Sequence, residues 1–222
     1  MNDITAIYYT SDTAPTSFLH TVREYLSKAI DNIPLIEIHQ PKTTPRSHLQ
    51  IYKNALQGAR MAKTKYIAFC EDDVLYTKEH FKNRPQEGKF AYNMSVWSIY
   101  TWIDPPMFSW KDRRNLSQLI CERELFIEAM DERFDKYIPE VQEKLGNEWF
   151  VKYWAEPGKY ERQIGVTKRE TEEFFTEPPN IAFSHETALS FSGLGKKKKL
   201  GHLRSYEVPF WGKARDILNY YV

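Results

Sequence analysis

The chain has 222 residues, of which 41% are hydrophobic and 27% charged, so its composition excludes a disordered protein and suffices for one compact domain. The formal net charge of +1 excludes nucleic-acid binding through overall charge, so such binding would need a local basic patch. The two cysteines, Cys70 and Cys121, exclude a disulfide framework. No apolar run approaches the roughly 20 residues that span a bilayer, and no signal peptide is evident. We therefore expect a cytoplasmic protein, in the host cytoplasm if it is viral, without membrane insertion.

The first hundred residues alternate strand patterns with helix patterns. From β-branched and aromatic runs we expect strands at residues 4–9, 35–38 and 66–69. Apolar residues at helical spacing predict a helix at 16–30, capped by Thr16 or Ser17, and a second helix capped by Ser47. This order predicts a parallel sheet with right-handed crossovers. A Gly-x-Gly-x-x-Gly turn is missing from this Rossmann-like half, which argues against a nicotinamide-dependent dehydrogenase.

The second half of the sequence contains further patterns of both kinds. We expect strands at about 90–100, 119–121 and 180–183, and helices at about 123–134, 140–153 and 214–220. A run of four lysines, Lys196 to Lys199, lies between glycines and predicts an exposed loop. This run has three interpretations: a solvated loop, a lid over a diphosphate, or a contact with an acceptor that carries phosphates.

Three consecutive carboxylates, Glu71, Asp72 and Asp73, follow the strand expected at 66–69. The carboxyl ends of strands are where open α/β sheets bind ligands. Strand alternation places Glu71 and Asp73 on one face and Asp72 on the other. Like charges so close together repel one another, and Mg²⁺ or Mn²⁺ would offset that repulsion because these cations prefer oxygen ligands. The alternative interpretation is a solvated acidic turn.

With this triad the chain resembles the GT-A glycosyltransferases, whose Asp-any-Asp motif closes a central strand. The resemblance implies that Asp73 binds the metal, that Glu71 is the ribose-side or outer-shell acid, and that Asp72 belongs to the donor site. The first position is Glu rather than Asp. The implied fold is a single α/β, Rossmann-like GT-A domain over 1–222, with a central, mostly parallel sheet flanked by helices. About 1–100 would hold a UDP-sugar donor and about 101–222 the acceptor, with Mn²⁺ or Mg²⁺ as cofactor.

Further residues are expected around this donor site. Thr10 and Asp12 lie in the loop after the first strand, where this fold class holds the base and ribose. Arg46 precedes the second long helix and could reach the donor. Their alternative role is ordinary turn chemistry. In many GT-A enzymes a late histidine completes the metal site, and His185, which follows the strand at 180–183, is the first choice here. The second choice is His202, and a structural role is the alternative for both.

The catalytic base and the acceptor contacts are less defined by the sequence. Glu148 lies among aromatic residues that could raise its pKa, and Asp131 is a second candidate base. The alternative for Glu148 is an ordinary glutamate on a helix surface. Trp97 and Trp102 lie beside a Pro-Pro loop and are expected on the acceptor side, because indoles stack on sugars and on flipped bases; core packing is the alternative for Trp97. Lys196 and Lys197 are the lysines assigned to the acceptor.

The region from Arg46 to Tyr100 also resembles the small phage and base-J-type DNA glycosyltransferases. The resemblance rests on the triad with Val74-Leu75-Tyr76, on His80-Phe81, and on Phe90-Ala91-Tyr92-Asn93 with Trp97. It implies transfer of a sugar, glucose above all, to hydroxymethylated pyrimidines in DNA, with the target base flipped out of a duplex or on a single strand.

Three other functions remain open. The first is a cytosolic glycosyltransferase that acts on a surface glycan or a lipid-linked sugar. The second is a non-catalytic nucleotide-sugar-binding module. The third, a nucleotidyl- or phosphotransferase, is disfavoured because the chain has no Gly-rich phosphate loop. The sequence does not decide between inversion and retention at the anomeric carbon, and it does not determine the oligomeric state.

Overall fold

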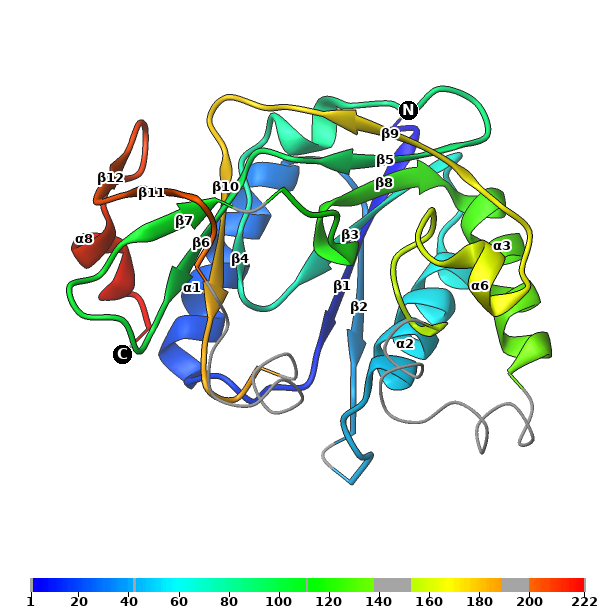
Figure 1. The fold of residues 1–222 in the computed structure, drawn as a ribbon, viewed down its shortest axis with the longest axis horizontal. Helices are drawn as coiled ribbons and strands as arrows, with labels where there is room; N and C mark the ends of the chain where they lie inside the picture. Colours follow the sequence, from blue (N-terminus) through cyan, green and yellow to red (C-terminus); the bar gives the residue numbers. More distant parts are fainter. Residues whose placement is uncertain (1, 42, 111, 138–152, 189–199, 222) are drawn as a thin grey trace.

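The computed structural model describes residues 2–41, 43–110, 112–137, 153–188 and 200–221 (Figure 1). The elements of the first hundred residues are β1 (Ile4–Thr10), α1 (Thr16–Ile30), β2 (Leu35–His39), α2 (His48–Met61), β3 (Tyr66–Glu71), β4 (Val74–Leu75), a 3₁₀ helix (His80–Lys82), β5 (Lys89–Asn93) and β6 (Val96–Tyr100). Those that follow are β7 (Phe108–Trp110), a 3₁₀ helix (Leu116–Gln118), β8 (Leu119–Glu122), α3 (Arg123–Lys136), α6 (Glu161–Ile164), β9 (Glu170–Phe174), β10 (Asn180–Ser184), β11 (Leu203–Ser205), β12 (Glu207–Val208), β13 (Gly212–Lys213) and α8 (Ala214–Leu218).

Two larger sheets organise the described residues. The first has the order β2-β1-β3-β8-β5-β9, in which β1 runs parallel to β2 and β3, and β5 runs parallel to β9. Strand β8 is antiparallel to both β3 and β5. The second sheet has the order β11-β7-β6-β10-β4, with β10 parallel to β6 and antiparallel to β4. The α/β fold with a mixed, mostly parallel central sheet flanked by helices is the expected fold class.

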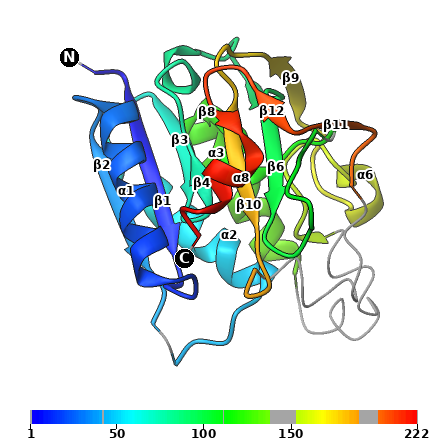
Figure 2. The same ribbon diagram turned by 90° about the vertical axis from the view of Figure 1, so that its left-hand side faces the viewer.

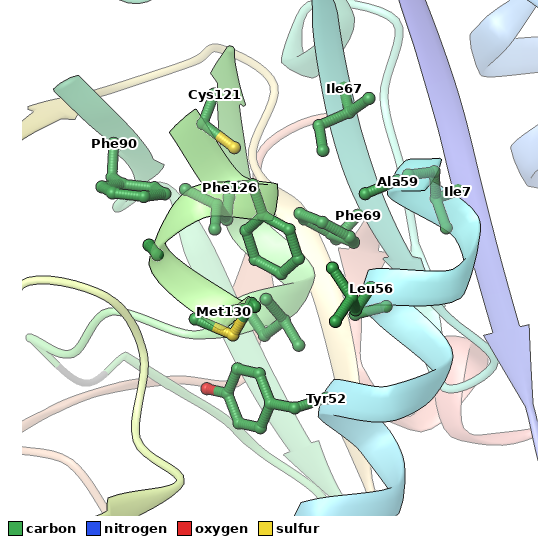
Figure 3. Close-up of a cluster of buried hydrophobic side chains, with 14 of the residues drawn as sticks. Ile7, Tyr52, Leu56, Ala59, Ile67, Phe69, Phe90, Cys121, Phe126 and Met130 are labelled. Carbon is green, nitrogen blue, oxygen red and sulfur yellow. The ribbon is translucent and has the colours of Figure 1, made fainter. Parts of the chain in front are cut away.

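Helices cover both faces of the six-stranded sheet. Figures 1 and 2 show α2 and α3 on one side and α1 on the other, while α8 packs with strands of the second sheet. On the α2 and α3 side, Ile7, Phe69 and Phe126 belong to one buried cluster (Figure 3). The alternate residues of β1 and β3, such as Ala6 and Tyr8, point to the α1 side and pack in one cluster with Leu26. The same alternation separates two acids of the triad. Glu71, the last residue of β3, and Asp72, which follows it, point to opposite faces of the sheet.

Helix α2 lies very close to β1 at Gly58. A Cβ atom added to Gly58 would lie 2.3 Å from Cγ2 of Ile7, which is closer than van der Waals contact allows. The glycine thus lets α2 pack directly on the strand that leads to the first loop of the site.

Several predicted boundaries are confirmed and others are corrected. Ser47 caps α2, since its hydroxyl accepts a hydrogen bond from the Gln50 N–H at 3.1 Å. The predicted side-chain cap of α1 was wrong: Thr16 is already helical, and Pro15 precedes it without a capping hydrogen bond. The strand expected at 90–100 is two strands in different sheets, β5 and β6. The chain turns between them because the Asn93 side-chain carbonyl accepts the Ser95 N–H at 2.9 Å.

The other differences concern the second half of the chain. The helix expected at 140–153 lies almost wholly outside the described residues. Five predicted strands are confirmed within one or two residues at their ends: 4–9, 35–38, 66–69, 119–121 and 180–183. Strand β9 was missed because four of the five residues from Glu170 to Phe174 are polar and at least partly exposed, so they show no apolar alternation. No described helix is both long enough and apolar enough to cross a membrane.

Candidate active site

A cleft of about 320 Å³ opens at the carboxyl ends of β1, β3 and β10, beside the start of α2. Six of the residues singled out in the sequence line it: Thr10, Arg46, Glu71, Asp72, Asp73 and His185. They come from four separate parts of the chain, which the sheets bring together. The cleft therefore lies where ligands bind in open α/β sheets.

Glu71 is the last residue of β3 and is held by two tyrosines. Its Oε1 accepts a hydrogen bond from Tyr9 Oη at 2.8 Å, since Tyr9 lies opposite Glu71 in the parallel register of β1 and β3. Its backbone N–H donates to Tyr76 Oη at 3.0 Å, and Tyr76 Oη donates to the Ser117 carbonyl at 2.9 Å. Burial, followed by the charge of Asp73, raises the pKa of Glu71 to about 8.

Asp72 lies on the opposite face of the strand and interacts with the end of β1. The Thr10 hydroxyl donates a hydrogen bond to Asp72 Oδ2, and the backbone N–H of Asp12 donates to Thr10 Oγ1 at 2.9 Å. Burial and the charge of Asp73 raise the pKa of Asp72 to about 6. The side chain of Asp12 does not line the cleft. Its carboxylate lies 3.5 Å from Nδ1 of His39, so Asp12 supports the loop rather than facing the donor.

Asp73 and His185 both line the cleft and face each other, with His185 Nε2 lying 3.7 Å from Asp73 Oδ2. The antiparallel pairing of β4 with β10 brings them together, and the Phe183 N–H donates to the Asp73 carbonyl at 2.7 Å. His185 is 3% exposed. Its Nδ1 lies 2.8 Å from the Thr187 hydroxyl, which donates to the Thr13 carbonyl. Because that hydroxyl donates its proton to the Thr13 carbonyl, it accepts from Nδ1–H of His185, and Nε2 faces Asp73.

These two side chains fit a divalent cation. His185 Nε2 and Asp73 Oδ2 lie 3.7 Å apart, and a cation between them would take the neutral imidazole and the carboxylate as ligands. Among the described residues no group of three His, Cys, Asp or Glu side chains has metal-binding geometry. A site built from the Asp73 and His185 pair leaves positions for water and for phosphate oxygens, the arrangement in which Mg²⁺ is usually bound by proteins.

Two arginines bring positive charge to the cleft. Arg46, just before the Ser47 cap of α2, donates a hydrogen bond to the Thr187 carbonyl beside His185. Arg113, which the sequence analysis did not single out, also lines the cleft and makes no hydrogen bond or ion pair within the described part of the chain. A half-exposed guanidinium without a partner is available to an anionic ligand.

Other predicted residues lie away from the cleft. Asp131, a candidate base, is on the outer part of α3, where its carboxylate pairs with Arg60 at 2.5 Å, so this position does not suit a catalytic role. Trp97 packs against the cluster that contains Phe183, and the Trp102 ring makes an edge contact with Tyr100 at 5.4 Å. Neither indole lines the cleft. The remaining predicted residues, Glu148, Lys196 and Lys197, lie outside the described residues.

The structure adds residues that sequence reasoning missed. Glu156 and Trp154 line the cleft, together with Tyr52 and His48 from α2. Glu156 follows an aromatic pair and precedes Pro157-Gly158, so the signal that favoured Glu148, an acid beside aromatic residues, was present here too. Burial raises the pKa of Tyr52 well above its usual value, and the same cause lowers the pKa of His48.

Comparisons with known proteins bear on the fold. No protein-family model matches the sequence, and no curated protein matches it. A glycosyltransferase involved in the glycosylation of the major capsid of PBCV-1 superposes with a TM-score of 0.50 and 7% identity, over 82% of this chain and 92% of that one. A Drosophila beta-1,4-galactosyltransferase 7 mutant, in complex with manganese, UDP-Gal and xylobiose, superposes with a TM-score of 0.47 and 12% identity, over 90% and 83% of the two chains. The second score is too low to support an argument. The first, with the sheet order and helix layers above, shows that the chain has the α/β fold of the GT-A glycosyltransferases.

Proposed function

We propose that this protein is a metal-dependent glycosyltransferase that moves a sugar from a nucleoside-diphosphate sugar to an acceptor hydroxyl. The observation that carries the proposal is the Asp73 and His185 pair, 3.7 Å apart in a cleft of a GT-A-like fold, with His185 Nε2 facing the carboxylate. A cation bound there would stabilise the negative charge that develops on the leaving diphosphate.

The donor would occupy the end of the cleft formed mainly by about the first hundred residues. Thr10, Glu71 and Asp72 surround the place where a ribose would bind, and the two tyrosine hydroxyls hold Glu71 in orientation. Arg46 and Arg113 supply guanidinium groups for the phosphate oxygens. UDP as the nucleotide and glucose as the sugar are part of this proposal, and they rest on the sequence resemblance.

Glu156 is our candidate for the base that accepts the proton of the acceptor hydroxyl. Among the described residues that line the cleft, it is the one carboxylate outside the triad. Its Oε2 lies 3.0 Å from Nζ of Lys159, which orients the carboxylate. Glu148 remains the alternative base from the sequence, so both Glu156→Gln and Glu148→Gln belong in the assay.

The acceptor has two candidates, and the cleft favours one of them. Hydroxymethylated pyrimidines in DNA are proposed on the sequence pattern and on the lysine run. However, the described lining carries the carboxylates of Asp72, Asp73 and Glu156, besides Glu71 with its pKa of about 8, against two arginines. A phosphate-rich strand close to these carboxylates would be repelled, whereas an uncharged saccharide would not. Activity with hydroxymethylated DNA and with saccharide acceptors should therefore be measured side by side.

The proposal is tested by thermal unfolding with UDP, GDP, ADP and TDP, each with and without Mn²⁺. We expect one diphosphate to raise the melting temperature only when the metal is present, because a cation held by Asp73 and His185 would supply positive charge for the phosphates. A ligand at about 100 times its dissociation constant stabilises the folded state by roughly 2.7 kcal/mol, a change that a melting curve resolves. A shift without later turnover of the nucleotide sugar would favour a non-catalytic binding module. If no diphosphate has an effect, the triad is an acidic turn and the proposal fails.

A further inference from the structure

The segment from Tyr153 to Glu161 brings both Trp154 and Glu156 to the cleft. It contains no strand, and its turns leave main-chain carbonyls that neighbouring backbone does not satisfy. Tyr153, Trp154 and Ala155 are all buried, so these carbonyls need donors from elsewhere in the protein.

Arg133 on α3 supplies these donors from a side chain that is 1% exposed. Its Nη1 donates to the Tyr153 carbonyl at 3.4 Å and to the Ala155 carbonyl, the residues on either side of Trp154. In return, Tyr153 Oη donates to the Arg133 carbonyl at 2.9 Å. The segment is thus bound to α3 by hydrogen bonds in both directions, immediately before Glu156.

Glu161 completes the arrangement as the buried counter-charge. Its Oε1 lies 3.8 Å from Arg133 Nη2, and its side chain is 4% exposed. Its two carboxylate oxygens accept the backbone N–H groups of Gly158 at 2.8 Å and Arg169 at 2.7 Å. Glu161 therefore fixes the turn that directly follows Glu156.

A buried ion pair of this kind is weak evidence for a role in stability. Removing two charges from water is costly, and well-packed apolar residues at such sites are often equally stabilising. The pair does, however, hold one irregular segment in one place through directional contacts with three of its backbone groups: the Tyr153 and Ala155 carbonyls and the Gly158 N–H. That property matters where a side chain on the segment must be positioned accurately.

We propose that Arg133 and Glu161 are positioning residues that hold Glu156 in place for proton transfer at the cleft. This inference rests on the proposed function. In the step concerned, the acceptor O–H gives its proton to the Glu156 carboxylate while its oxygen bonds to the anomeric carbon. The bond from that carbon to the diphosphate oxygen breaks, and the electron pair leaves on the diphosphate. A displacement of Glu156 by about 1 Å is enough to lower such a rate by roughly 100-fold.

The test uses hydrolysis of UDP-glucose with Mn²⁺, in which water replaces the acceptor. Arg133→Met and Glu161→Gln should lower kcat by about 10- to 100-fold while KM for UDP-glucose stays within about twofold, because the donor end of the cleft is untouched. Arg133→Lys should recover part of the loss, since an ammonium can still reach one carbonyl. The matched control is Arg169→Gln, which removes the guanidinium that pairs with Glu128 and Glu132 and keeps the backbone N–H that Glu161 accepts. Its kcat should be close to wild type.

A double-mutant cycle separates positioning from general destabilisation. If Arg133 acts through Glu156, Arg133→Met should lower kcat little further in a protein that already carries Glu156→Gln. Fully additive losses would overturn the proposal, as would an unchanged kcat in both Arg133→Met and Glu161→Gln. If Arg133→Met does not fold, Glu161→Gln and Arg133→Lys give the same comparison.

Hydrogen exchange makes the inference independent of activity. Amides of residues 153–161 should exchange faster in Arg133→Met and Glu161→Gln than in wild type or Arg169→Gln, while those of β3 stay protected. Unchanged exchange would show that Arg133 and Glu161 do not hold this segment in place. If wild type neither binds a diphosphate with Mn²⁺ nor hydrolyses UDP-glucose, the proposed function fails, and the exchange data still show whether the segment is held by this ion pair.

Discussion

At the scale of single residues, the protein surrounds one short acidic run with hydrogen-bond donors. Tyr9 and Thr10 come from adjacent positions of β1 and therefore reach opposite faces of β3, where they donate to Glu71 and Asp72. Asp73 lies beyond the strand and instead faces His185. The three acids thus have three different surroundings, although they are consecutive in sequence.

The metal assignment predicts distinct effects for the two ligands. Asp73→Asn should abolish the stabilisation by a diphosphate with Mn²⁺, because a neutral amide is a poor replacement for a carboxylate ligand. His185→Ala should weaken Mn²⁺ affinity by about 10- to 100-fold, measured as the Mn²⁺ dependence of the melting temperature with UDP present. The neighbouring Glu186→Gln is the control, since Glu186 is exposed and should leave the titration unchanged. A wild-type Mn²⁺ response in Asp73→Asn would refute the assignment.

At the scale of elements, the site depends on how closely α2 packs on the sheet. Ser47 caps the start of α2, and Gly58, near its end, lies directly against β1. The start of α2 therefore lies beside the carboxyl ends of β1 and β3. Tyr52 and His48 reach the cleft from the same helix. The position of α2 therefore contributes directly to the shape of the cleft.

Gly58→Ala should lower the free energy of unfolding by about 1–3 kcal/mol, the usual effect of overpacking. This is the opposite of what helix propensity alone predicts, because alanine favours a helix by roughly 1 kcal/mol over glycine. The reason is the clash with Ile7, whose Cγ2 a new Cβ would approach to 2.3 Å. Urea unfolding measures the difference, with Gln57→Ala on the exposed face of α2 as the control. A stabilised Gly58→Ala would mean that α2 can move away from β1 at little cost.

At the scale of the whole molecule, buried ionisable groups make folding stability depend on pH. His80 is fully buried among the rings of Tyr76, Phe81 and Phe174, and its Nδ1 lies 3.2 Å from the Asn93 amide. Burial lowers its pKa to about 3. Below the ordinary histidine pKa the unfolded chain therefore takes up a proton that the folded protein does not bind.

This difference predicts a loss of stability as the pH falls. Between about pH 6.5 and pH 3, His80 should lower the free energy of unfolding by roughly 1.4 kcal/mol per pH unit, and above pH 6.5 it should contribute no slope. The raised pKa values of Glu71 and Asp72 act in the opposite direction, so the prediction concerns the difference between wild type and His80→Gln. Urea unfolding at several pH values should give a flatter profile for His80→Gln. Parallel profiles would show that His80 titrates normally in the folded state.

The sequence by itself determined the features that depend on local pattern. Alternating strands and helices over the first 71 residues, the Ser47 cap and the place of the triad at a strand end all follow from the spacing of apolar residues and from capping chemistry. The fold class follows from that order, because strands separated by helices form a sheet with parallel neighbours. The sequence singled out Asp73 and His185 as a metal-binding pair because each follows a recognisable strand, and the folded protein brings them to one cleft.

Only the tertiary structure decided which distant residues meet. The side-chain carbonyl of Asn93 divides one apolar run between two sheets, and periodicity carries no information on such a break. Glu156 reaches the cleft on the Tyr153–Glu161 segment, which Arg133 and Glu161 bind to α3, whereas Asp131 lies on the outer part of α3 and pairs with Arg60. These contacts join residues more than twenty positions apart in the chain. Their formation depends on burial and on the pairing of polar groups in the folded protein, which no local stretch of sequence specifies.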